Sequence, residues 1–136
     1  MKTKAVASLV LVVGLLAVCA PLFAHHGNVA YDEEHIVVLK GATVTRFIWA
    51  NPHNLVLFDM KDAKGNVTHW SVEAGSPSAL SNVGWTRDSL HPGDVVAVYL
   101  HQSKLGSPAG RLNKIVCADG TELRDSTYGQ DPASAK

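Results

Sequence analysis

Short apolar runs separated by polar turns follow one another after residue 36, and they predict β-strands. The runs 43–49 and 55–60 are rich in β-branched and aromatic residues, and they flank Ala-Asn-Pro-His at 50–53. Proline lacks an amide hydrogen and disfavours helical angles at the residue before it, so this tetrapeptide predicts a bend between two strands. The bend presents His53 at a strand corner, where an imidazole can bind a ligand or transfer a proton.

The other apolar runs predict the remaining elements. A first strand over 36–49 contains Gly41, which predicts a bulge or a tight bend. Ser76-Pro77 is typical of a helix start and Gly84 of a helix end, and we expect Trp85 to fill the core. The further strands are predicted at 55–60, 67–73, 95–100 and 112–118, with a short last strand ending at 123.

Three strands, a short helix and two further strands follow the order of the OB-fold. The sequence therefore predicts an all-β protein with one short helix, folded as a small OB-fold-like antiparallel barrel. Another small antiparallel barrel or a sandwich is the alternative. OB-folds bind ligands on the face of strands two and three, between the loop joining strands one and two and the loop joining strands four and five. Here these loops carry His53 and residues 104–110.

Strand register predicts that a carboxylate lies near the same bend. If the second and third predicted strands form a hairpin about the polar turn between them, Leu55 lies opposite Glu73, which is then close to His53. His101 ends the fourth predicted strand at the same pole of the barrel. The predicted ligand-binding residues are Asn51, His53, Glu73 and His101. We favour a simpler interpretation for three other histidines, as polar surface residues. They are His35, His69 and His91.

The first 24 residues predict a secretory signal peptide. Lys2 and Lys4 give a basic start, residues 5–20 are uncharged and mostly apolar, and Ala24 is the small residue expected before a cleavage point. An uncleaved membrane anchor is one alternative, because the uncharged run is long enough to span a bilayer. Lipid modification of Cys19 is another, because the residues before it weakly match a bacterial lipobox.

Cleavage after Ala24 would remove 24 of the 136 residues and leave 112, a length typical of one domain. We expect residues 25–123 to form a barrel domain that begins with an extended N-terminal arm. We expect residues 124–136 to form a disordered polar tail. Loss of Lys2 and Lys4 lowers the basic count from 12 to 10 against 12 acidic residues, for a formal charge of −2. The chain has no basic run, so no nucleic-acid partner is expected, and no membrane span is expected after processing.

All seven histidines follow the predicted cleavage point. Cleavage would place His25 at the N-terminus, where its α-amine and Nδ1 form a chelate, with His26 beside it. Imidazole and amine nitrogens suit Cu(II), Ni(II) and Zn(II), and affinity is generally highest for Cu(II). The predicted metal ligands are His25, His26, His53 and Glu73. The simpler interpretation is a flexible histidine-rich start with adventitious metal affinity.

The sequence contains no familiar catalytic motif such as Gly-x-Ser-x-Gly, His-Glu-x-x-His or Cys-x-x-Cys. Only Cys117 follows the cleavage point, so we expect no intramolecular disulfide and a thiol packed among apolar neighbours. We therefore favour a non-enzymatic periplasmic module that binds a small ligand, or copper or another divalent metal, through histidines. The alternatives are a copper-dependent oxidoreductase that uses His25 and a module that docks another envelope protein through the barrel face.

Several motifs occur here in a combination typical of one family. They are His25-His26-Gly27, Tyr31-Asp32, Gly41-x-x-Val-Thr-x-Phe-x-Trp-x-Asn-Pro-His53, Trp70-Ser-Val-Glu73, Ser76-Pro77, Gly84-Trp85 and Leu90-x-Pro-Gly-Asp94. From residue 25 to about 123 the chain resembles a family of small exported bacterial proteins that is catalogued only as a domain of unknown function. The resemblance implies a periplasmic or secreted protein of a Gram-negative bacterium, and it implies no particular activity or ligand.

Overall fold

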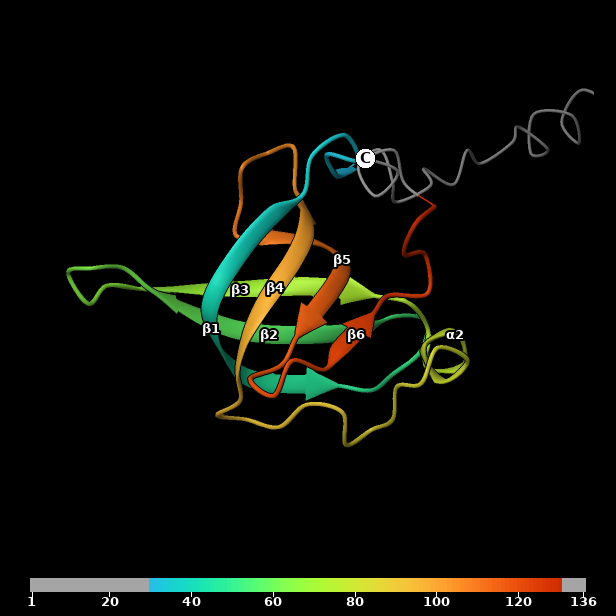
Figure 1. Ribbon diagram of the computed structural model, residues 1–136. Coiled ribbons are helices and arrows are strands. Elements are labelled where there is room, and N and C mark those ends of the chain that lie inside the picture. The colour runs from blue at the N-terminus through green and yellow to red at the C-terminus, as the bar shows by residue number, and fades with distance from the viewer. Residues whose placement is uncertain (1–29, 131–136) are drawn as a thin grey trace, which may run out of the picture.

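Six strands and one short helix follow one another along residues 30–130, the part of the chain that the computed structural model describes (Figure 1). The elements are β1 (Val37–Ile48), β2 (Asn54–Lys61), β3 (Val67–Ala74), α2 (Pro77–Ser81), β4 (Val95–Gln102), β5 (Ala109–Val116) and β6 (Glu122–Arg124). The predicted order of strands and helix is confirmed. The predicted signal peptide, the N-terminal histidines and the last six residues lie outside the described part. No helix within residues 30–130 is long and apolar enough to cross a membrane.

β1 pairs with a different neighbour along each of its halves. Residues 37–43 are antiparallel to β4, and residues 43–48 are antiparallel to β2. The pairing with β4 shifts between Lys40 and Ala42, where Gly41 has a φ of +77°, a left-handed angle that favours glycine. The irregularity predicted at Gly41 is thus confirmed, and such a bulge helps a long strand to bend around a barrel.

A parallel strand pair closes the sheet into a barrel. The hydrogen-bonded strand order is β3-β2-β1-β4-β5-β6, and β3 also pairs with the start of β5, where Glu73 stands opposite Arg111. The predicted barrel is confirmed, but its strand pairing is mixed rather than wholly antiparallel, because β3 and β5 run in the same direction. β5 begins at Ala109 and not at the predicted residue 112, and the additional residues make the closing contact.

The barrel interior is apolar, and the helix region contributes to it. Ser76 caps the helix by accepting a hydrogen bond from the amide of Ala79 (3.3 Å), and Pro77 is the first helical residue, as predicted. Trp85 is 2% exposed, and its Nε1 donates to the carbonyl oxygen of Arg124 (2.8 Å), which joins this region to β6. The other buried apolar residues are Ala42, Val44, Val56, Phe58, Val72, Ala74, Leu80, Leu90, Val96, Val98, Leu100, Leu112 and Ile115.

The chain beyond β6 stays packed on the barrel as far as Tyr128. The disordered tail was predicted to begin at Arg124, whereas Arg124 ends β6 and residues 125–130 form a bend and turns. Asp125 is 3% exposed, its amide donates to the carbonyl oxygen of Asn113 (2.9 Å), and its Oδ1 accepts from the amide of Gly75 (2.8 Å). Such pairing attaches the segment to the barrel, because a buried carboxylate needs hydrogen-bond donors.

Gly110 lies where β5 packs against the end of β4, beside the closing contact with β3, and provides a test of this packing. A Cβ at Gly110 would lie 2.6 Å from the backbone oxygen of His101 and 2.6 Å from Leu100 Cδ1. We therefore expect Gly110→Ala to lower the free energy of unfolding by about 1–3 kcal/mol, a usual cost of overpacking. The exposed change Ser107→Ala is the control and should stay within about 0.5 kcal/mol of the wild type. Urea unfolding followed by tryptophan fluorescence measures both, and a Gly110→Ala protein as stable as the wild type would contradict this packing.

Candidate functional site

A buried asparagine fixes the turn that carries His53. Asn54 is fully buried, its Nδ2 donates to the carbonyl oxygen of Gly75 (2.7 Å), and its Oδ1 accepts from the amide of Ala50 (3.1 Å). The turn joins β1 to β2, as predicted, and contains a cis peptide bond before Pro52. Because Gly75 directly follows β3, Asn54 ties the turn to the end of that strand. His53 is therefore presented beside the end of β3.

His53 and Glu73 are in contact, and their proximity follows from the predicted register. β2 pairs with β3 so that Leu55 stands opposite Glu73. Nδ1 of His53 is paired with Oε1 of Glu73, and the two side chains are 54% and 31% exposed. The imidazole is thus held by a carboxylate on one side while about half of its surface remains open to solvent. The role of this pair in ligand binding stays a prediction.

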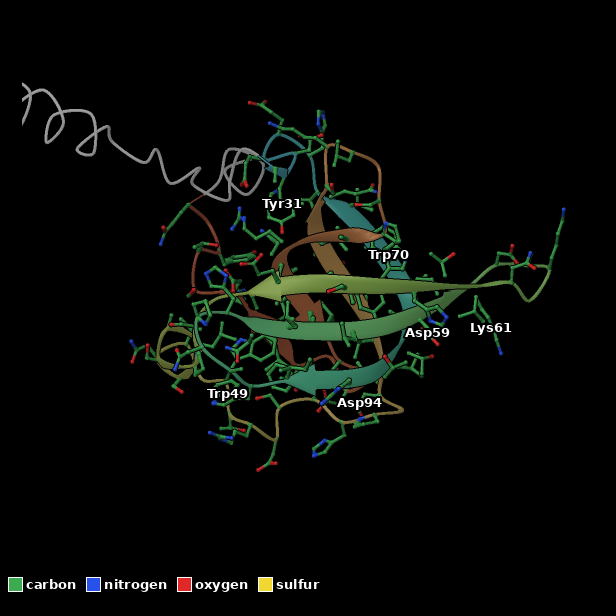
Figure 2. All side chains as sticks on the ribbon, turned by 180° about the vertical axis from the view of Figure 1, so that it is seen from behind. Tyr31, Trp49, Asp59, Lys61, Trp70 and Asp94 are labelled. Carbon is green, nitrogen blue, oxygen red and sulfur yellow. The ribbon has the colours of Figure 1, made fainter. Side chains whose placement is uncertain are left out.

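The N-terminal arm, residues 30–36, supplies a second partner for Glu73. The Tyr31 hydroxyl donates to Oε2 of Glu73 (3.1 Å), so each carboxylate oxygen has a partner of its own. Figure 2 shows the Tyr31 side chain directed from the arm toward β3. Tyr31 also forms a β-bridge with Ser103, and the amide of Asp32 donates to the carbonyl oxygen of Gln102 (2.9 Å). These backbone contacts hold the arm against the end of β4.

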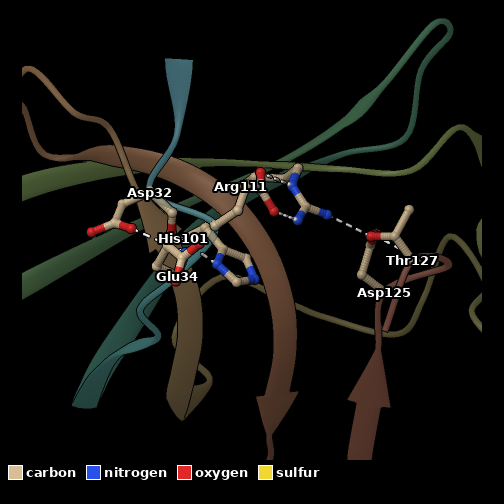
Figure 3. A network of polar contacts seen from close by, with 7 residues as sticks. Asp32, Glu34, His101, Arg111, Asp125 and Thr127 are labelled. Carbon is tan, nitrogen blue, oxygen red and sulfur yellow. Dashed lines mark hydrogen bonds and ion pairs between the residues drawn. The ribbon is translucent and has the colours of Figure 1, made fainter. Parts of the chain in front are cut away.

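Arg111 joins the arm to the segment that follows β6. Its Nε donates to Oε1 of Glu33 (3.2 Å) and its Nη2 to Oε2, a bidentate ion pair whose side chains are 14% and 22% exposed. Its Nη1 donates to Oγ1 of Thr127 (2.5 Å). Figure 3 shows the guanidinium directed toward Thr127, with Asp125 beyond it. Arg111 stands opposite Glu73 in the strand pairing, yet its charge is matched by the arm.

Asp125 continues this network to the turn that carries His53. Its Oδ2 accepts from Oγ1 of Thr127 (2.7 Å), and its Oδ1 accepts from the amide of Gly75 (2.8 Å). The carbonyl oxygen of Gly75 in turn accepts from Asn54. A continuous series of polar contacts therefore runs from Arg111 to the residue that fixes the turn.

The other two residues predicted at this pole have different surroundings. His101 is fully buried, and its Nδ1 donates to the backbone oxygen of Asp32 (3.1 Å), beneath the arm (Figure 3). It stands opposite Arg111 in the pairing of β4 with β5. Asn51 is exposed in the turn before His53. The structure thus brings His53 and Glu73 together and places His101 under the arm, where it supports the arm backbone.

Three further histidines of the described part also lie beside carboxylates, at the surface, as expected. Their side chains are 78%, 82% and 64% exposed. The hydrogen bond from His35 is the main reason that the pKa of Asp32 lies below its usual value. The pairs are His35 with Asp32, His69 with Asp59, and His91 with Asp94.

Cys117 is a free thiol packed against the hydrophobic core. It is partly buried, and burial raises its pKa above the usual value. A thiol with a raised pKa carries little of the reactive thiolate. This agrees with the packing role predicted for it.

The geometry of the pole suits a ligand that is bound through His53. Since Nδ1 of His53 faces a carboxylate, Nε2 is the ring nitrogen left for a ligand. Within residues 30–130, however, no group of three or more His, Cys, Asp and Glu side chains is placed to hold a metal ion. A metal ion at His53 would therefore need further ligands from residues outside that range or from water.

Sequence reasoning missed the parts played by four residues that support the pole: Tyr31, Glu33, Asn54 and Arg111. Tyr31 belongs to one of the family motifs, but it is 42 residues from its partner Glu73. Glu33 and Arg111 are 78 residues apart. Contacts over such separations leave no periodic pattern. The available signal was chemical, because an arginine directly before a predicted strand requires an acidic partner if it is buried.

A comparison with protein-family models matches residues 12–113 to one family, described as a family of unknown function (DUF6152). Neither the curated proteins nor the solved structures gave a match to the chain. The matched range contains β1 to β4 and most of β5, together with His53 and Glu73. Because the match covers well over half of the 136 residues, the chain belongs to this family of unknown function, DUF6152.

Proposed function

We propose that this protein is a periplasmic ligand-binding module that binds a divalent metal ion, with Cu(II) favoured, through His53. The observation that carries the proposal is the contact of Nδ1 of His53 with Glu73, whose second oxygen accepts from Tyr31 (3.1 Å). A metal-binding histidine commonly directs its other ring nitrogen to a carboxylate, which fixes the ring and raises its basicity. His53 already has such a partner.

The position of the pair in the barrel also supports a binding role. OB-fold proteins bind ligands on strands two and three, beside the loop that joins strands one and two. His53 lies in that loop, and Glu73 lies near the end of β3. With 54% of its side chain exposed, His53 is accessible to a small ligand.

We propose that His25 and His26 supply the remaining protein ligands. They precede Tyr31 by six and five residues, and an extended chain of six residues spans about 20 Å. Because Tyr31 is bonded to Glu73, either histidine has enough chain to reach His53. Export with cleavage after Ala24 would also free the α-amine of His25, and amine and imidazole nitrogens favour Cu(II).

Copper titration of the mature protein tests the role of His53. We expect His53→Ala to abolish tight Cu(II) binding, and Glu73→Gln to weaken it about 10-fold, since loss of a carboxylate behind a histidine ligand typically costs about 10–100-fold. His69→Ala is the matched control, because Nδ1 of His69 also faces a carboxylate, 2.6 Å from Oδ1 of Asp59. Isothermal calorimetry gives the affinities. If His53→Ala binds Cu(II) as tightly as the wild type, the pole is not the metal site.

Processing of the N-terminus provides a second test. The intact mass of protein exported from a Gram-negative host should correspond to a chain that begins at His25. One additional residue before His25 removes the amine chelate, so we expect weaker Cu(II) binding, whereas one residue added after Lys136 should change nothing. A retained N-terminus or a lipidated Cys19 would exclude the chelate. Unchanged affinity of the extended protein would exclude the α-amine of His25 as a ligand.

A further inference from the structure

We infer that Arg111 is a positioning residue for the contact between His53 and Glu73, an inference that rests on the function proposed for this pair. Its guanidinium bonds to Glu33 in the arm and to Thr127 after β6. The contact with the arm connects Arg111 to Glu73, and the contact with Thr127 connects it to the turn that carries His53.

The path through the arm leads to Glu73. The bidentate ion pair with Glu33 fixes the arm two residues after Tyr31, whose hydroxyl donates to Oε2 of Glu73 (3.1 Å). Bidentate pairing restrains the angle as well as the distance between the two groups. Without Arg111, the mostly buried Glu33 carboxylate loses its cation, and keeping it in place becomes unfavourable. The arm would then move toward solvent and take the Tyr31 hydroxyl away from Glu73.

The path through the segment after β6 leads to the turn of His53. Nη1 of Arg111 donates to Thr127, whose hydroxyl donates to Oδ2 of Asp125 (2.7 Å). Oδ1 of Asp125 accepts from the amide of Gly75 (2.8 Å), and the carbonyl oxygen of Gly75 accepts from Nδ2 of Asn54 (2.7 Å). Because Asn54 fixes the turn, loss of Arg111 should change the position of His53 as well as that of Glu73.

Lys114 offers a matched control on the same strand. Its Nζ lies 2.6 Å from Oε1 of Glu122, and its side chain is 17% exposed, against 14% for Arg111. The Lys114 ion pair joins β5 to β6, whereas the Arg111 ion pair joins β5 to the arm. Arg111→Met and Lys114→Met therefore each remove one half-buried ion pair, and only the first removes a contact with the arm.

Cu(II) calorimetry on the folded variants tests the inference. We expect Arg111→Met to lower the Cu(II) affinity about 10-fold or more, as for other supports of a histidine ligand. Lys114→Met should remain within about 2-fold of the wild type, because its ion pair with Glu122 has no contact with the arm. Arg111→Lys should fail to restore affinity, because an ammonium cannot form the bidentate pair. Equal losses in Arg111→Met and Lys114→Met would overturn the inference, since general destabilisation would then explain both.

Nitrogen NMR of the metal-free protein separates this inference from the proposed function. We expect Arg111→Met to shift the imidazole nitrogen resonances of His53, while the imidazole nitrogen resonances of His69 stay unchanged. We also expect it to speed hydrogen exchange of the Asp32 amide. If the wild type binds no Cu(II), the metal proposal fails, and the His53 resonances still decide the positioning role. Unchanged His53 resonances in folded Arg111→Met would overturn it. Should Arg111→Met not fold, Glu33→Gln carries the same measurement.

Discussion

The pairing of β3 with β5 is the constraint on which the polar pole depends. It spans three residue pairs, and β5 reaches it along the end of β4, where a Cβ at Gly110 would lie 2.6 Å from the backbone oxygen of His101. Register within the β2 and β3 hairpin alone would bring His53 to Glu73. Closure of the barrel adds Arg111 opposite Glu73, and with it a cation to which both the arm and the segment after β6 are bonded. A contact on one hairpin thereby becomes part of a network that both ends of the described chain support.

The fold could be predicted where local chemistry decides it. Gly41 marks the irregularity of β1, and Ser76-Pro77 starts the helix, because left-handed angles and free helix amides favour particular residue types. The start of β5 was missed for a physical reason. Residues 109–111 are Ala-Gly-Arg, which is typical of a loop by composition, yet the missing side chain of glycine is what allows β5 to approach β4. The local sequence does not distinguish a glycine that allows two strands to pack closely from a glycine in a flexible loop.

The candidate site was predictable only as far as one hairpin extends. A short turn joins β2 to β3, and their register places Leu55 opposite Glu73. His53 lies two residues before Leu55 and is therefore near Glu73. Tyr31 and Arg111 reach the pole through tertiary packing, and nothing in the sequence near either residue specifies its partner. His101 was assigned to the right pole, but its burial depends on the arm that covers it, and an extended polar arm gives no sign of where it docks.

Contact between an imidazole and a carboxylate is common on this surface and does not by itself define a site. His35 and His91 each lie beside an aspartate three residues away, and His69 faces Asp59 across the pairing of β2 with β3. His53 contacts Glu73 from the turn before β2. Glu73 differs because its second oxygen is bonded to a residue 42 positions away, on an arm that further contacts hold. Its side chain therefore has less freedom to turn. An imidazole with such a partner loses less conformational entropy when a ligand binds, and this favours binding at His53 over His69.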